Sequence, residues 1–229
     1  MPGSLLRYSD EQTVAGVAAV FSAMEGLRLK PDRFEGWGVV AAPRFLGRAN
    51  LAQAMRSFAA EGVWGISPHL IPHFALHSPS GTISLALGLQ GPNLGVGGGL
   101  HSAAEGFLTA LTWLATGVVP GVWLILSGWS PELVPDRRGG TSSCGDCLAL
   151  ALALVTAGPG NHGPTFQVVS GVEPCEVTAA IDLARLARSL GRRDEPIPRT
   201  ITTDPAGRLR VELVSDAGRL PRTGHNGHA

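Results

Sequence analysis

The stretch GPNLGVGGGLHSAAEG, residues 91–106, decides the fold class of this 229-residue chain. A Gly-Pro turn leads into a short strand-like run over Leu94–Gly97, and the glycine run then ends at Gly99, just before a predicted helix over Leu100–Thr116. A strand that turns sharply through small residues onto a helix N-terminus is where many enzymes hold a nucleophile. The first residues past the glycines are Leu100 and His101, so this setting carries a leucine.

The composition indicates a chain that is partly covered by another protein. Apolar residues make up 44% of the sequence and charged residues only 16%, against about 25% charged residues in typical domains. The net charge is zero, which leaves no electrostatic case for nucleic acid or an anionic membrane as a partner. No apolar run reaches the ~18 residues of a membrane helix, and no basic-then-apolar leader is visible. With three cysteines, the chain is expected in a reducing, cytoplasmic compartment.

Hydrophobic periodicity predicts strands that alternate with helices up to residue 128, so the predicted class is α/β. The predicted helices are 10–24, 48–62, 67–79, 81–90, 100–116 and 177–190. The predicted strands are 37–42, 94–97, 122–128, 147–155, 165–172, and a pair at 199–203 and 208–214.

The order of elements over 67–128 resembles the N-terminal half of β-ketoacyl synthases, the thiolase-fold condensing enzymes of fatty-acid and polyketide synthesis. The segments that carry the resemblance are SGTISLALGLQGPNLGVGGG (80–99), TGVVPGVWLILSG (116–128) and SSCGDCLALALALV (142–155). The last is similar to the segment where the family reads Gly-Glu-Gly-Ala before an apolar strand.

The resemblance implies a thiolase-like fold with a mixed, mostly parallel sheet covered by helices and a truncated C-terminal half. Residues 1–157 would form the ketosynthase N-terminal-like domain. Residues 158–218 would be a reduced C-terminal extension packing on the same domain, and 219–229 a disordered tail.

Counted from Gly91-Pro92, the catalytic cysteine of the family falls on Leu100, which has no lone pair to attack a thioester. The family's two catalytic histidines have no match among the late histidines, which are His162, His225 and His228. This pattern is similar to the chain-length factors of type II polyketide synthases, whose short versions accompany polyene-type systems. Those subunits usually carry Gln where the cysteine was, so Leu100 departs from the family and puts a decarboxylative role in doubt.

The resemblance implies a non-catalytic subunit that pairs with an active β-ketoacyl synthase, as a heterodimer or a heterotetramer. The complex would meet an acyl carrier protein transiently. No cofactor or metal is expected in this chain, because the partner would use the carrier protein's phosphopantetheine thioesters.

The same resemblance assigns a partner interface and a tunnel end. In condensing enzymes the strand before the nucleophile position forms the dimer, and here Leu100 would fill the unused pocket. The interface residues would be Leu94, Gly95, Val96, Gly97, Gly98, Gly99, Leu100 and His101. The helix over 48–62 lies where the family's tunnel-end residues lie, so Leu51, Met55 and Phe58 would limit the length of the growing acyl chain. Met55 and Phe58, each taken alone, are interpreted as ordinary core residues, so the tunnel-end prediction concerns the helix and not one residue.

Two motifs leave other functions open. His69, His73 and His77 are spaced four apart, so a helix would present all three on one face, and two such histidines can hold zinc. The CGDC motif, Cys144 to Cys147, matches the spacing of redox proteins, but a strand-like run follows where a thioredoxin-type site needs a helix. The alternatives are therefore a stand-alone metal- or thiol-dependent enzyme, and a structural homodimer without a ketosynthase partner.

Overall fold

A four-stranded sheet with the strand order β2-β1-β3-β4 forms the centre of the computed structural model. The strands are β1 (Gly38–Pro43), β2 (Asn93–Gly95), β3 (Gly121–Ser130) and β4 (Asp146–Val155). Strand β1 runs parallel to both β2 and β3, and β4 pairs antiparallel with β3. The predicted mixed, mostly parallel sheet of an α/β fold is confirmed.

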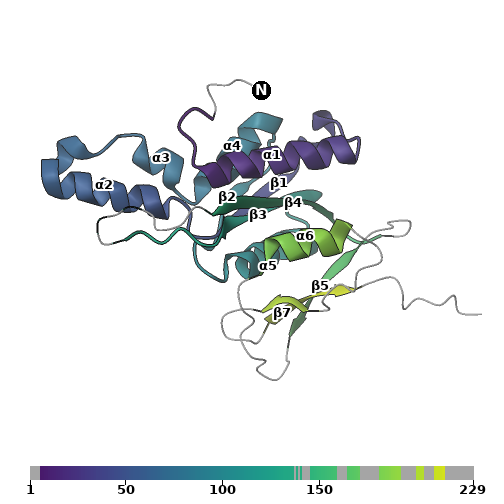
Figure 1. The fold of residues 1–229 in the computed structure, drawn as a ribbon. Helices are drawn as coiled ribbons and strands as arrows, with labels where there is room; N and C mark the ends of the chain where they lie inside the picture. The colour runs from purple at the N-terminus through teal and green to yellow at the C-terminus, as the bar shows by residue number, and fades with distance from the viewer. Residues whose placement is uncertain are drawn as a thin grey trace, which may run out of the picture.

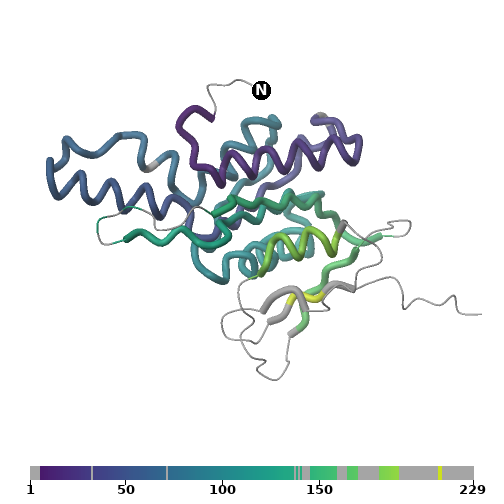
Figure 2. The backbone as a smooth tube through the Cα atoms, viewed as in Figure 1, coloured from purple at the N-terminus to yellow at the C-terminus, as the bar shows by residue number. Residues whose placement is uncertain are grey.

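The structure describes residues 6–136, 138, 140, 145–158, 164–170, 181–191, 200–203 and 209–214. Their course along the backbone can be followed in Figure 2.

Helices cover both faces of the central sheet (Figure 1). One face carries α1 (Glu11–Gly26) and α4 (His77–Leu87), and the short 3-10 helix η1 (Pro31–Phe34) adds to the same core. The opposite face carries α5 (Ser102–Ala115) and α6 (Leu183–Gly191). Helices on both faces of the mixed sheet bury its central strands on both sides, which explains why β1 and β3 are almost continuously apolar.

Neighbouring residues of the buried strands divide between two separate cores, because successive side chains of a strand point to opposite faces. Val39 and Trp123 pack with α1 and α4. Val40 and Leu124 pack with α5 and its neighbours. All four side chains are fully buried.

The predicted start of the first helix is confirmed by its cap. The Asp10 carboxylate accepts a hydrogen bond from the Gln12 backbone N–H at 2.8 Å. By contrast, α5 begins at Ser102 and not at Leu100. The preceding Gly97 and Gly98 have φ angles of +83° and +97°, so the chain is still turning when it reaches Leu100.

The predicted helix boundaries between 67 and 90 are wrong in one respect. A five-residue helix α3 (Leu70–Phe74) is followed by α4, which begins at His77 and runs through Pro79. The prediction ended a helix at Pro79, but proline is tolerated in the first turn of a helix because its missing N–H has no partner there anyway.

The helix α2 (Arg48–Glu61) and the 3-10 helix η2 (Gly62–Gly65) form an arm that projects to one side of the layered body (Figure 1). The helix was predicted, but it has no buried residue. We call residues 48–65 the arm.

A second, three-stranded sheet lies beyond α5 (Figure 1). It has the order β5-β7-β6 and consists of β5 (Thr165–Ser170), β6 (Thr200–Thr203) and β7 (Leu209–Val214), all antiparallel. The rings of Phe107 in α5 and Phe166 in β5 lie 5.1 Å apart, which joins this sheet to the core below the central sheet. The predicted pairing of the last two strands is confirmed. For the predicted helix 177–190, residues 177–180 lie outside the described residues, and α6 begins only at Leu183.

Candidate functional site

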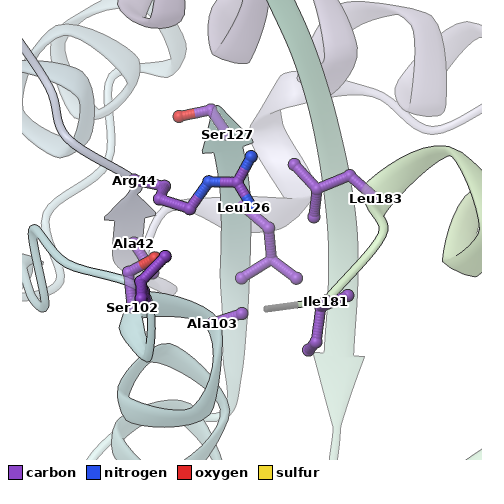
Figure 3. Close-up of a pocket in the computed structure, with 9 residues that line it drawn as sticks. Ala42, Arg44, Ser102, Ala103, Leu126, Ser127, Ile181 and Leu183 are labelled. Atoms are coloured by element: carbon purple, nitrogen blue, oxygen red, sulfur yellow. The ribbon is translucent and has the colours of Figure 1, made fainter. Parts of the chain in front are cut away.

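The carboxyl ends of β1 and β3 meet the N-terminus of α5 at one place, shown in Figure 3. Just past β1, Arg44 forms an isolated parallel bridge with Gly98. The left-handed turn at Gly97 and Gly98 then leads the chain into α5. In α/β proteins, ligands bind in crevices outside the carboxyl ends of the strands, so this junction is the first candidate site.

The glycines before the junction are needed by contacts within the chain. A Cβ atom on Gly95 would lie 1.9 Å from the backbone oxygen of Leu76, and one on Gly97 would lie 2.6 Å from the Cα of Ser102. A Cβ on Gly99 would meet nothing within 4 Å. These contacts explain Gly95 and Gly97 without a second chain, and Gly99 is the position with open space.

Leu100 lies in the turn directly before α5, as the prediction of a strand-to-helix junction requires. It borders a cavity of about 10 Å³, which is room for about one water molecule. Leu100 is 54% exposed in this chain alone, so this chain by itself does not bury it. The lining residues are Ala42, Arg44, Leu100, Ser102, Ala103, Leu126, Ser127, Ile181 and Leu183.

A mostly buried polar network holds the strand ends together on one side of this cavity. The Arg44 guanidinium pairs through Nε with the Glu132 carboxylate and donates from Nη2 to the Trp129 backbone oxygen at 2.7 Å. Gln12 donates from Nε2 to the Arg44 backbone oxygen at 2.9 Å and accepts from the Ser127 hydroxyl at 3.0 Å. The network joins the start of α1 to the ends of both strands, and Glu132 balances the charge of Arg44.

Sequence reasoning missed this network. One signal was available: Arg44 directly follows the buried run 38–43, and ligands bind outside the carboxyl ends of parallel strands. The partners Gln12 and Glu132 are far from Arg44 in sequence, so only the fold brings them there.

The described lining of the cavity contains two hydroxyl groups, those of Ser102 and Ser127, but no histidine, cysteine or carboxylate. Nucleophilic catalysis by serine needs a general base within hydrogen-bond reach. The Ser127 hydroxyl is bound to Gln12, and His101 does not border the cavity. This part of the site therefore offers no nucleophile paired with a base.

Asp10 caps α1 close to the network and has a perturbed acidity. Burial raises the pKa of Asp10 to about 6, partly opposed by the hydrogen bond from Gln12, and the nearby Glu11 carboxylate raises it further. The carboxyl group thus changes charge in the mildly acidic range.

The thiol alternative is not supported at Cys147, the described half of the CGDC motif. Burial raises the pKa of Cys147 to about 12, and the carboxylates of Asp10, Glu11 and Glu132 add to the shift. Since the thiolate is the reactive form, this thiol is inert near neutral pH. Cys144 lies outside the described residues.

The three histidines do not share one helix face, so that prediction is wrong. The helix breaks between them: His69 precedes α3, His73 lies in it, and His77 begins α4. The Tyr8 ring stacks on His69, with centroids 5.0 Å apart and planes 3° from parallel, and His73 lies against the same ring. Within the described ranges, no group of three metal-ligating side chains comes together.

The predicted tunnel-end residues Leu51, Met55 and Phe58 lie on the arm. All three are more than half exposed, and none of them borders the cavity at Leu100. The sequence analysis did not single out Val63 and Trp64 at the tip of the arm, where the Trp64 side chain is 90% exposed. The arm therefore presents a row of apolar side chains that this chain does not cover.

The predicted interface strand β2 is the outer strand of the central sheet. No other strand of the described residues pairs with its free edge. Leu94 at its centre is exposed. An unpaired edge of this kind can accept a strand from another chain.

No helix in the described part of the chain is long and apolar enough to cross a membrane.

No protein-family model matches the sequence, and no curated protein matches it. Solved structures do match. A ketosynthase in complex with its chain length factor from Xenorhabdus doucetiae gives a TM-score of 0.59 at 15% identity, over 94% of this chain and 82% of that chain. The ishigamide ketosynthase/chain length factor gives 0.51 at 17% identity, over 72% of this chain and 50% of that chain.

A structure of a type II polyketide synthase acyl-carrier protein, in complex with its ketosynthase bound to the hexaketide, contains a chain that gives a TM-score of 0.50 at 21% identity. That match covers 56% of this chain and 37% of the other. With the 50% of the ishigamide structure, this chain therefore spans less than two thirds of the length of two of the three matched chains. At such identities the likeness is one of fold. Together with the observed sheet and its helical layers, it shows that this chain has a thiolase-like α/β fold related to that of the ketosynthases.

Proposed function

We propose that this chain is a non-catalytic, chain-length-factor-like subunit of a type II polyketide synthase. It pairs with an active β-ketoacyl synthase, stabilises it and shapes its acyl tunnel. The observation that carries the proposal is Leu100, which lies in the turn between β2 and α5 where the resemblance places the nucleophilic cysteine.

The chemistry of the reaction then belongs to the partner. Decarboxylative Claisen condensation needs a thiolate that accepts the acyl group from a thioester, and groups that stabilise the developing oxyanion. Leucine can neither accept the acyl group nor exchange a proton. The partner supplies the cysteine and both histidines, and it takes acyl and malonyl groups from an acyl carrier protein.

Two uncovered surfaces support the pairing. The free edge of β2 can continue the sheet into a partner, and Leu94 lies on that edge. The arm carries Met55, Phe58 and Trp64 in contact with solvent, and apolar groups gathered on one surface indicate an interaction site. In the complex, Leu51, Met55 and Phe58 line the far end of the partner's tunnel.

The pairing is tested by co-expressing this chain with the ketosynthase encoded nearest to its gene and measuring the mass of the purified complex by light scattering. We expect a 1:1 complex, as a heterodimer or its dimer, and an inert or poorly soluble chain when it is expressed alone. A soluble monomer that does not bind the ketosynthase contradicts the proposal, and a homodimer that excludes the ketosynthase favours the purely structural alternative.

Matched variants locate the contact. Phe58→Asp and Trp64→Asp place a charge on the arm and should abolish co-purification. Val118→Asp places the same charge near the amino end of β3, at a position about as exposed as Phe58 (58% against 53%), and should leave the complex intact. Equal loss in all three variants would show that the arm is not the contact.

Restoring the cysteine should not restore the enzyme. The Leu100→Cys variant is expected to show no condensation activity on its own, because the cavity lining described above offers no base. Turnover by that variant alone would mean that a general base exists in this chain and that the proposal is wrong.

A further inference from the structure

The helix α2 of the arm lacks the local interactions that usually hold a helix in place. Its N-cap residue is Gly47, which has no side chain to accept a hydrogen bond from the first turn. Its first residue is Arg48 and its last is Glu61. Both charges oppose the helix dipole, which favours acidic groups at the N-terminus and basic groups at the C-terminus. By contrast, α1 is capped by Asp10 and carries Glu11 in its first turn.

Tertiary packing does not replace these missing interactions. Among the described helices of eight or more residues, α2 is alone in having no buried residue. Its main contacts are with η2 and the five-residue helix α3, and not with the strands of the central sheet. Most of the stability of a helix in a protein comes from burying its apolar face. The apolar face of α2, with Leu51, Met55 and Phe58, is more than half exposed in this chain.

The intrinsic preference of the sequence keeps α2 close to the balance between helix and coil. Five of its 14 residues are alanine, the best helix former. Helices shorter than about 12–15 residues are nevertheless marginal in water, even when they are rich in alanine. The segment is therefore neither firmly helical nor opposed to the helix, and a modest additional interaction decides its state.

Glycines at both ends allow α2 to change without disturbing the sheet. Gly47 and Gly62 have φ angles of +63° and +66°, a conformation that glycine adopts at little cost. A Cβ on Gly62 would meet nothing within 4 Å. The helix thus lies between two points where the backbone can rearrange.

We propose that α2 is only marginally helical in the isolated chain and becomes a stable helix when the ketosynthase covers its apolar face. The identity of the covering protein rests on the proposed function, whereas the marginal stability of the isolated chain does not. The arm carries two arginines and one glutamate, which is too little positive charge for binding to an anionic membrane, so the cover is a protein surface. The residues proposed for the tunnel end are then held in place only after pairing.

The first test is hydrogen exchange, followed by mass spectrometry, of the full chain alone and in the co-purified complex. A soluble protein fused to the N-terminus keeps the lone chain in solution where it would otherwise precipitate. Amides in the core exchange only through global unfolding, whose equilibrium constants are about 10³–10⁸. In the lone chain we expect the α2 amides to exchange at least about a hundredfold faster than those of α5. In the complex we expect α2 to slow by about tenfold or more.

The second test compares Gln53→Gly with Gln53→Ala. Gln53 is exposed and lies on the side of α2 opposite to the apolar face. Glycine lowers the helix equilibrium constant about fivefold relative to alanine. The Gly variant should therefore bind the ketosynthase about three- to fivefold more weakly than the Ala variant, while the lone chains unfold at the same urea concentration. Ala18→Gly is the matched control at an exposed position of α1. It should lower the folding equilibrium constant of the lone chain about fivefold and leave the affinity unchanged.

The outcomes separate this proposal from the proposed function. Exchange of α2 as slow as that of α5 in the lone chain would overturn the proposal, even if the ketosynthase binds. Fast exchange of α2 in both the lone chain and the complex would overturn it as well, and so would equal affinities of the two Gln53 variants. If no complex forms, ordering on pairing falls together with the proposed function, but fast exchange in the lone chain would still establish that α2 is marginally stable.

Discussion

Replacing Gly95 by alanine tests the close packing that positions the candidate site. The new Cβ would lie 1.9 Å from the backbone oxygen and 2.2 Å from the carbonyl carbon of Leu76. Ordinary carbon–oxygen contacts begin at about 3.3 Å, so β2 or the chain before α4 has to move by about 1.4 Å. Because the obstacle is backbone, no side-chain rotation relieves it.

The expected cost of Gly95→Ala is about 3 kcal/mol, the upper end of the range for overpacking a well-packed interior. In a domain of this size such a loss lowers Tm by about 6–12 °C. Thermal unfolding followed by circular dichroism, together with a urea titration, measures both quantities. The bond from Val96 N–H to the Ala41 oxygen, 2.9 Å long in this structure, is the one that the shift would strain first.

Gly99→Ala is the matched control, since a Cβ there meets nothing within 4 Å. Its free energy of unfolding should stay within about 0.5 kcal/mol of the wild type, as for most surface substitutions. If Gly95→Ala and Gly99→Ala melt at the same temperature, the explanation of the glycine run by contacts within the chain is wrong. If Gly99→Ala is stable alone yet binds the ketosynthase more weakly, the open space at Gly99 is where the partner approaches.

Three further predictions concern the network and the core. The pKa of Asp10 is raised from 3.8 to about 6, so the folded chain holds this proton more tightly than the unfolded chain, and the free energy of unfolding should fall as pH rises from about 4 to about 6 and then level off. Asp10→Asn should abolish this pH dependence and raise the free energy of unfolding at pH 7 by up to about 3 kcal/mol. An unchanged pH dependence in urea titrations would contradict the assignment. Cys147 should resist alkylation in the native chain at neutral pH and react once the chain is unfolded, as peptide mass spectrometry would show; rapid native labelling would mean that its thiol is not shielded. Phe107→Ala removes a fully buried ring and should cost about 3–5 kcal/mol, whereas a loss below about 1 kcal/mol would show that α5 is not packed as described.

Much of the fold was predictable because local signals agree with the tertiary structure. The buried strand at 38–43 and the Asp10 cap follow from residues that are near each other in sequence. The start of α4 was missed because a proline inside a first turn looks the same in sequence as a proline that ends a helix.

The candidate site was only partly predictable. The junction at Leu100 follows from the glycine run before it, but the network of Gln12, Arg44 and Glu132 does not, because its members meet only after the sheet has formed. The exposure of the arm could not be predicted from the sequence either, because the apolar stripe of Leu51, Met55 and Phe58 has the same spacing whether it faces a core or a partner.

The most direct test of the proposal that this chain is a non-catalytic subunit is intact-mass spectrometry of the co-purified complex after incubation with acyl-loaded acyl carrier protein. We expect an acyl adduct on the ketosynthase and an unchanged mass for this chain. An acyl adduct on this chain would contradict the proposal.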